Sequence, residues 1–486
     1  MTTVTREVFE DPRLKTGALL LCTAIAAVVT GALASAQPLL VVAVVLGAGL
    51  VVCVWKYPVT AALLIIGVTP LVVGIDRGKL IPVLRPNEGL LFLLAGILVA
   101  RGLVRAPARV RIRDRLNALE WSLVMMGIAA SIVPLVWMVA RGQHPTGDDI
   151  SYSLVLWKFV AVYVVVRVCV RTDREVLWCL IVSVGVAAVI GLIGIMQALD
   201  LFGVRGLLVT WFIPEGTNPL AIEAPRAGAT LALPAAAADL LVFNLAIVVG
   251  IWYRVRRYGA LLAVLVAIYV PGVFAAGEFS SVLALLVGTV AVAAALRRLD
   301  LLRYAPFLFV GTGIVMWPVI EHRLIGFQGL SGLPVSWTTR LSNLRTYFWP
   351  QLFSGPNILL GVRPAARVLV ATEDTGYKWI ESGYTWLLWG GGIPLLAAFF
   401  HFVRTAGGMT LRRCRRLSSW SSVAALASFA AVNVIVVTMI FDPHLTYRGS
   451  ADLLFSLLAL SMTAGAAKTA SADIPATPQS VEGADR

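Results

Sequence analysis

Charged residues are scarce in this sequence. Only 14% of its 486 residues are Asp, Glu, Lys or Arg, whereas 59% are hydrophobic, and the mean hydropathy is +0.87. Soluble globular domains carry about 25% charged residues. The scarcity of charge excludes an ordinary soluble protein, and we expect an integral membrane protein.

The residue types that build metal, redox and nucleotide sites are also few. The five cysteines contain no C-x-x-C pair, and the four histidines lack the i, i+4 spacing of a helical zinc site. The acid pair Glu373-Asp374 is explained more simply by salt bridges with nearby arginines. No glycine-rich phosphate loop is present, which argues against an ATP-driven pump. We therefore expect no metal and no cofactor.

What the sequence does contain is a long succession of apolar runs. Because about 17 to 25 apolar residues span a bilayer, these runs predict an all-α polytopic membrane protein of about fourteen transmembrane helices. A single transmembrane domain is expected over 16–467, between a cytoplasmic tail at 1–15 and a disordered cytoplasmic tail at 468–486. The predicted spans are 16–35, 38–55, 59–75, 88–105, 119–139, 152–170, 176–199, 229–252, 259–275, 280–296, 304–320, 383–403, 421–441 and 451–467.

The distribution of basic residues predicts the orientation. With the N-terminus inside, about two-thirds of the Lys and Arg residues fall in inside loops, which places both termini in the cytoplasm. The net charge of +14 thus reflects topology, and no nucleic-acid partner is expected. One long extracytoplasmic loop is predicted at 321–382. An alternative for the first span is a signal peptide, because ALASAQ at 32–37 resembles a cleavage site.

Several arginines stand in the predicted outer loops, against the positive-inside trend. Guanidinium groups bind phosphate oxygens through paired hydrogen bonds and keep their charge at any accessible pH. The pattern predicts an outward-facing site for an anionic head group, such as a phosphate or pyrophosphate on a lipid carrier. The alternative is that these arginines form ordinary salt bridges with Glu321, Glu373 and Asp374 or contact lipid head groups. The arginines are Arg226, Arg323, Arg340, Arg345, Arg363, Arg367 and Arg448.

Other candidate residues lie at or within the apolar runs. Glu381 opens the run ESGYTWLLWGGGIP and is either a general base toward a hydroxyl or a plain interfacial acid. Tyr384 is either a substrate contact or an interface anchor. Lys158 lies within the sixth span, where a charged residue is a functional candidate by default. Asp239 and Glu278 are similar cases.

The long loop has predicted structure of its own. A short helix is expected to begin near Arg363, with Pro364 in its first turn. Arg363 and Arg367 would then lie on neighbouring turns of one face.

Three stretches of the sequence resemble the O-antigen ligase and polymerase superfamily of bacterial membrane enzymes. PRAGATLALPAAAADLL (225–241) is similar to the family's arginine-glycine-threonine stretch entering a span. TRLSNLRTYFWPQLFSGPNILLGV (339–362) resembles its arginine, aromatic-rich helix and asparagine-proline-leucine-glycine turn. ESGYTWLLWGGGIP (381–394) resembles the segment that opens the span after the long loop.

Two departures from the family pattern bear on the reaction. Ligases usually carry histidine and asparagine where Glu381 and Ser382 stand, which favours a repeat-unit polymerase over a lipid A ligase. In GEFSSVLALL (277–286) an arginine that many members carry is missing.

The resemblance implies a GT-C-like, metal-independent inverting glycosyltransferase. It implies that Arg226, Arg340 and Arg345 hold the undecaprenyl pyrophosphate of a lipid-linked oligosaccharide donor and stabilise the leaving group. Glu381 would take the proton of the acceptor hydroxyl or orient it. Further substrate contacts are expected from Lys158, Arg363, Arg367, Tyr384 and Arg448.

The expected partners follow from this reading. They are the lipid-linked donor, a glycan acceptor, the lipid bilayer and other envelope polysaccharide export proteins. The expected place is the bacterial cytoplasmic membrane, with the active site facing outward.

Two rival functions stay open at this stage. A flippase or exporter of lipid-linked oligosaccharides would hold its charges in a central cavity between two similar halves. No internal repeat is visible here, and the charge is concentrated in one predicted loop, which favours the enzyme. A membrane scaffold or assembly partner is the third alternative.

Overall fold

The protein is built almost entirely of helices. The computed structural model describes residues 38–80, 84–105, 116–212, 226–325, 335–370, 376–415 and 417–463. In these ranges eight helical segments, of 18 to 32 residues, are long and apolar enough to cross a membrane. The described sheet is a short antiparallel pair, β1 (Arg367–Leu369) with β2 (Tyr377–Trp379). The all-α class predicted from the sequence is confirmed at this level.

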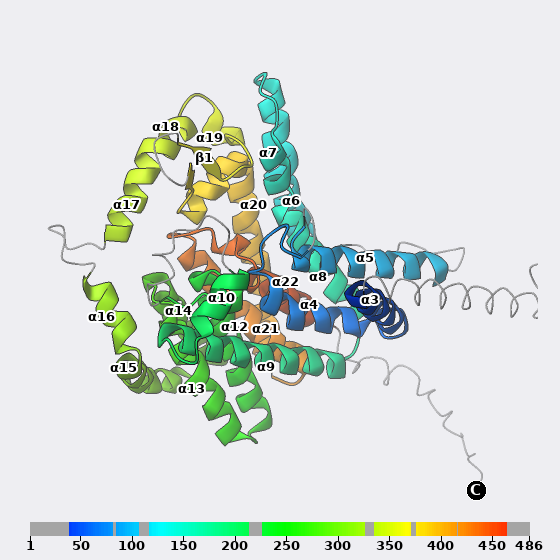
Figure 1. The fold of residues 1–486 in the computed structure, drawn as a ribbon, viewed down its shortest axis with the longest axis vertical. Helices are drawn as coiled ribbons and strands as arrows, with labels where there is room; N and C mark the ends of the chain where they lie inside the picture. Colours follow the sequence, from blue (N-terminus) through cyan, green and yellow to red (C-terminus); the bar gives the residue numbers. More distant parts are fainter. Residues whose placement is uncertain are drawn as a thin grey trace, which may run out of the picture.

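The elements follow one another along the chain as Figure 1 labels them. The long segments are α5 (Pro86–Arg105), α6 (Ala118–Ala140), α7 and α8 together (Gly147–Ser153, Val155–Cys169), α9 (Asp173–Ala198), α12 (Pro234–Val255), α14 (Phe279–Leu296), α20 (Gly383–Cys414) and α21 (Trp420–Thr438). Other apolar helices are α3 (Pro38–Lys56), α4 (Val59–Val72), α13 (Gly259–Ala275) and α22 (Ser450–Ser461). Smaller elements are α10 (Val204–Phe212), η1 (Ala229–Leu231), η2 (Leu299–Tyr304), α15 (Ala305–Val315), α16 (Trp317–Ile325), α17 (Val335–Asn343), η3 (Leu344–Phe348), α18 (Trp349–Leu352), α19 (Asn357–Leu360) and η4 (His444–Thr446).

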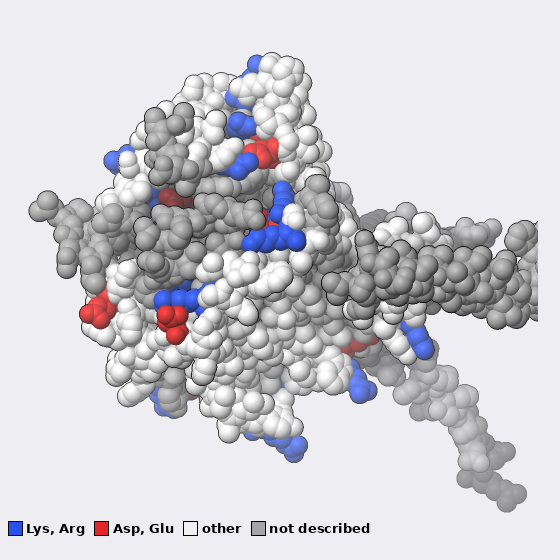
Figure 2. All heavy atoms as spheres, viewed as in Figure 1, with Lys and Arg blue, Asp and Glu red and all other residues white. Residues whose placement is uncertain are grey.

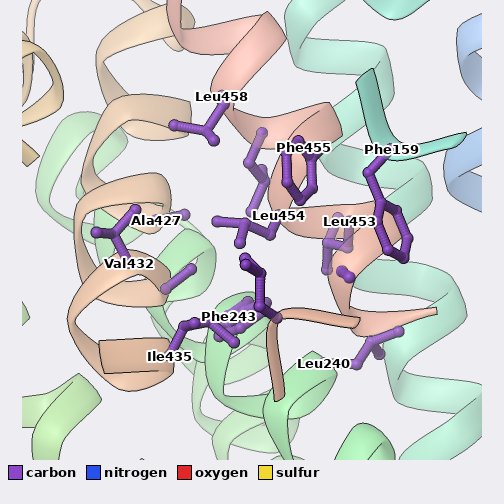
Figure 3. Packing of buried hydrophobic residues seen from close by; sticks show 14 of the residues in the cluster. Phe159, Leu240, Phe243, Ala427, Val432, Ile435, Leu453, Leu454, Phe455 and Leu458 are labelled. Carbon is purple, nitrogen blue, oxygen red and sulfur yellow. The ribbon is translucent and has the colours of Figure 1, made fainter. Parts of the chain in front are cut away.

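The core of the bundle surrounds α22, in which all 12 residues are buried. It packs against α8 and α21, and also against α12 (Figure 1). Figure 3 shows Phe455 of α22 beside Phe159 of α8, and their stacked rings have centroids 5.3 Å apart. Lipid tails are as apolar as these side chains, so in a bilayer the gain on packing comes from van der Waals contact rather than removal from water.

The glycine run of α20 allows two other segments to approach its backbone closely. Gly392 has φ +62°, and a Cβ there would lie 2.4 Å from the carbonyl oxygen of Leu359. A Cβ on Gly391 would lie 2.4 Å from the carbonyl oxygen of Ala129 in α6. At Gly392, only glycine tolerates both the left-handed backbone conformation and the close contact with Leu359. The run therefore sets the position of the 357–362 segment on α20.

The predicted spans from 38–55 onward each overlap helical structure, but eight of the described helical segments are long enough to count as candidate spans, and α4 and α22, with 14 and 12 residues, are not among them. The span predicted at 304–320 is broken at Met316 into α15 and α16, which are too short to cross a membrane singly. The spans at 259–275 and 280–296 are separate helices, divided at Gly277, which has φ +61°. The first predicted span, 16–35, and both predicted tails, 1–15 and 468–486, lie outside the described residues.

The prediction that a short helix begins near Arg363 is wrong. Residues 361–366 are irregular, and Arg367 begins strand β1 instead. Arg363 and Arg367 each bind a carboxylate of α7, so side-chain contacts to a distant helix determine this backbone rather than local helix propensity.

Candidate functional site

The segment from 335 to 369 is anchored to α20 and α6 by specific contacts. Phe348 is fully buried with its ring centroid 5.2 Å from that of Trp389, whose indole nitrogen donates to the carbonyl oxygen of Ala365 at 2.9 Å. Arg141, at the end of α6, donates to Oδ1 of Asn357 at 2.5 Å and to the carbonyl oxygen of Val362 at 2.5 Å. These contacts give the GPNILLG stretch a fixed place over α20.

Between this segment and the helix bundle lies a pocket of about 420 Å³, which we call the charged pocket. It brings together Arg226, Arg340 and Glu381, one from each of the three motif stretches identified in the sequence. The remaining lining residues are Glu278, Phe279, Ser280, Trp337, Thr339, Asn343, Tyr377, Lys378, Trp379 and Phe441.

Arg340 is the best-connected cation of the charged pocket. Its Nη1 lies 2.9 Å from Oδ2 of Asp442, and its Nε lies 3.8 Å from Oε1 of Glu381. Burial disfavours the charged guanidinium, but Asp442 and Glu381 outweigh this and raise the pKa of Arg340. Burial in turn raises the pKa of Asp442 to about 6, against the opposing effect of Arg340. Arg340 is thus a permanent cation with 25% of its side chain exposed to the pocket.

Arg226 is the second arginine that lines the charged pocket. Its Nε is buried and, among the described residues, has no hydrogen-bond partner. Buried polar groups usually have partners, and an unsatisfied one costs about 1 to 3 kcal/mol. A guanidinium held in this way beside a pocket is suited to binding an anion.

One wall of the charged pocket is aromatic. The ring of Trp337 lies 5.2 Å from that of Phe441 and 6.3 Å from that of Phe279, measured between centroids. Tyr377 and Trp379, on β2, also line the pocket and are partly exposed. An apolar wall facing fixed charges suits a ligand that has both a flat, weakly polar face and anionic oxygens.

Arg363 and Arg367 form ion pairs with α7 and do not line the charged pocket. Nε and Nη2 of Arg363 donate to the two oxygens of Asp149 at 2.8 and 2.6 Å, and the carboxylate is fully buried. Arg367 pairs with Asp148 and lies 4.1 Å over the ring of Tyr377. Figure 2 shows charged side chains of both signs gathered between the 335–370 segment and α7. The salt-bridge alternative holds for these two arginines, with partners other than those expected.

The other predicted site residues lie in separate surroundings. Arg345 is exposed on η3, and Arg448 is exposed in the turn before α22. The hydroxyl of Tyr384 donates to the carbonyl oxygen of Val436 at 2.8 Å, which ties α20 to α21. Lys158 lies 3.6 Å from Oδ1 of Asp452 in α22. None of these four residues lines the charged pocket.

Several residues of the pocket region were missed or left without a role in the sequence reasoning. Glu278 precedes α14 and adds a second carboxylate to the lining, and Lys378 adds a third cation. Asp442, which pairs with Arg340, lies in the turn after α21. The signal for Asp442 was available in part, because DPHLTYRGS holds an acid, a histidine and an arginine between two apolar spans.

In the described ranges, no group of three or more His, Cys, Asp or Glu side chains is placed to hold a metal ion. Searches of protein-family models, curated proteins and solved structures give no match to this chain. The resemblance to the O-antigen ligase and polymerase superfamily therefore depends on the three motif stretches alone.

Proposed function

We propose that the protein is a membrane glycosyltransferase that transfers an oligosaccharide from a polyprenyl pyrophosphate carrier to a glycan acceptor. The observation that carries the proposal is the charged pocket, which gathers Arg226, Arg340, Lys378, Glu278 and Glu381 against an aromatic wall. Cations suit the pyrophosphate, a carboxylate suits the acceptor hydroxyl, and aromatic faces suit sugar rings.

In the proposed reaction an acceptor hydroxyl attacks the anomeric carbon of the donor sugar. The bond between that carbon and the pyrophosphate oxygen breaks, and the new glycosidic bond forms with inversion. Glu381 takes the hydroxyl proton, and the electron pair leaves with the lipid pyrophosphate. Arg226 and Arg340 stabilise the charge that builds on the leaving group, which is a preorganised electrostatic effect. Arg345 follows on the same helical segment, and its contact with the donor stays a prediction.

The proposal includes an arrangement in the membrane. The chain would cross the bacterial cytoplasmic membrane about fourteen times, with both termini in the cytoplasm. The 321–382 segment would then be extracytoplasmic, and the charged pocket would open toward the side where lipid-linked glycans are assembled. Glu381 in place of the usual histidine favours repeat-unit polymerisation over ligation to lipid A.

The second candidate function is a flippase or exporter of lipid-linked oligosaccharides. It would use the same anionic and sugar contacts. The buried Lys158–Asp452 pair within the bundle is the observation that favours it, because charges inside a membrane domain often mark a transport path. The aromatic wall and the two carboxylates of the charged pocket, Glu278 and Glu381, favour the enzyme.

The test is transfer by purified variants given a lipid-linked oligosaccharide donor. Arg340→Ala and Glu381→Gln should each lower the rate at least 100-fold, because each removes a charge that the transition state needs, and thermal unfolding of each variant checks that it is folded at the assay temperature. Arg205→Ala is the matched control, since Arg205 binds carbonyl oxygens at the end of α9 and does not line the pocket. Normal product from both pocket variants would contradict the assignment.

A further inference from the structure

A buried acid and histidine lie behind the charged pocket. Nδ1 of His444, in η4, is 2.7 Å from Oδ2 of Asp239, in α12, and both side chains are fully buried. The second oxygen of Asp239 and Nε2 of His444 have no hydrogen-bond partner among the described residues. Burying two ionisable groups is costly unless they pair, and even a paired arrangement gains little stability over apolar packing. The pair therefore calls for a role beyond stability.

The backbone connects this pair to the charged pocket. The N–H of His444 donates to the carbonyl oxygen of Asp442 at 2.7 Å, and the N–H of Tyr447 donates to that of His444 at 3.2 Å. Fixing the imidazole against α12 therefore fixes the turn that carries Asp442. The carboxylate of Asp442 in turn holds Arg340 at 2.9 Å. A continuous series of contacts runs from Asp239 to the pocket cation.

We propose that Asp239 and His444 are positioning residues that set the place and the charge of Asp442, and through it the anion affinity of Arg340. This inference rests on the proposed function only for the identity of the anion. Asp239 and His444 are not among the residues that line the charged pocket. Their effect passes through Asp442.

The charges around the pair make this coupling electrostatic as well as mechanical. Burial disfavours protonated His444, but Asp239 outweighs it and raises the pKa of the imidazole. The resulting positive charge helps to keep Asp442 ionised. The other groups that act on this turn are Glu278 before α14, Glu381 before α20, Arg340 on α17 and Tyr447 beside His444.

In the wild type, Asp442 binds a proton more tightly in the folded state than in the unfolded state, so its contribution to stability falls as pH rises from 3.8 to about 6.

Removing either Asp239 or His444 should raise the pKa of Asp442 further, which makes Asp442 easier to protonate. Asp239→Asn removes the carboxylate that favours protonated His444, and His444→Gln removes the imidazole itself. Each change should move the Asp442 titration up by about one pH unit, the effect of losing one nearby charge.

The experiment measures two pH profiles of the full-length protein in detergent, thermal unfolding and the binding of inorganic pyrophosphate. Both single variants should shift the midpoint upward in both profiles, and the double variant should shift it no further. Asn244→Ala is the matched control, because Asn244 is a buried polar residue of α12 that contacts Ser183 and Leu240 instead. It should leave the midpoint unchanged.

The outcomes separate this inference from the proposed function. Unchanged midpoints in both single variants, or additive shifts in the double variant, would overturn the positioning role. Shifted unfolding profiles in a protein that binds no pyrophosphate would support the coupling to Asp442 and overturn the pyrophosphate site. Shifts in both profiles would support both.

Discussion

Replacing Arg363 with alanine should loosen the 357–369 segment much more than replacing Arg367. The Arg363 guanidinium makes two hydrogen bonds to Asp149, whose carboxylate is 0% exposed, and a third to Oγ1 of Thr146 at 3.1 Å. Removing one partner of a buried ion pair costs about 3 to 5 kcal/mol. Since the Arg363 side chain is 33% exposed, water can enter the vacated space, and we expect about 2 to 3 kcal/mol.

Arg367→Ala provides the comparison. Its partner Asp148 is 41% exposed, so the ion pair contributes about 0 to 1 kcal/mol. The contact over the Tyr377 ring adds about 0.5 to 1 kcal/mol at such a site. The two arginines therefore differ because of the burial of their carboxylates and not because of their own position in the sequence.

Hydrogen exchange of the amides in 357–369 measures the difference directly. A loss of 2 to 3 kcal/mol corresponds to exchange about 30- to 150-fold faster in Arg363→Ala, against at most about 30-fold in Arg367→Ala. Equal acceleration in the two variants would refute the reasoning. Unchanged exchange in Arg363→Ala with a raised donor KM would instead assign Arg363 to substrate binding, as the sequence pattern predicts.

Two further predictions concern the glycine run of α20 and Asp442, the partner of Arg340. Gly392→Ala should destabilise the protein by about 1 to 3 kcal/mol in thermal or denaturant unfolding, because the new Cβ meets the Leu359 carbonyl and the backbone is left-handed; the control Gly407→Ala, where a Cβ meets open space, should not. Pyrophosphate affinity should rise as pH falls through about 6, since protonation of Asp442 leaves Arg340 less neutralised. Asp442→Asn should remove the difference that Asp442 makes, leaving only the pH dependence that the ionisation of pyrophosphate itself produces over the same pH range.

The sequence predicts the helices well because the signal is local. An apolar run of membrane-spanning length has few alternatives to a helix, since its backbone groups must be satisfied within the segment. The three motif stretches also led to Arg226, Arg340 and Glu381, which the structure brings to one pocket. The motifs did not predict which other residues of the long loop line the pocket together with these three.

The misses share a physical cause, which is that the partners are distant in the sequence. Arg363 and Asp149 are separated by 214 residues, and His444 and Asp239 by 205. Periodicity and local propensity carry no information about such pairs. The irregular backbone at 361–366 follows from the same long-range contacts. Local propensity does not register those contacts, and it therefore predicted a helix there. The break at Met316 does have a local signal, because Pro318 lacks the N–H that a continuous helix would need and stands in the first turn of α16.

The most direct test of the proposed function is to reconstitute the purified protein in vesicles with a defined polyprenyl-pyrophosphate oligosaccharide and no nucleotide. Mass spectrometry of the glycans and lipids then reports elongation and the release of free polyprenyl pyrophosphate. The enzyme should yield longer chains and one released lipid pyrophosphate for each bond formed. Movement of the donor across the vesicle membrane without elongation would contradict the account and favour the flippase.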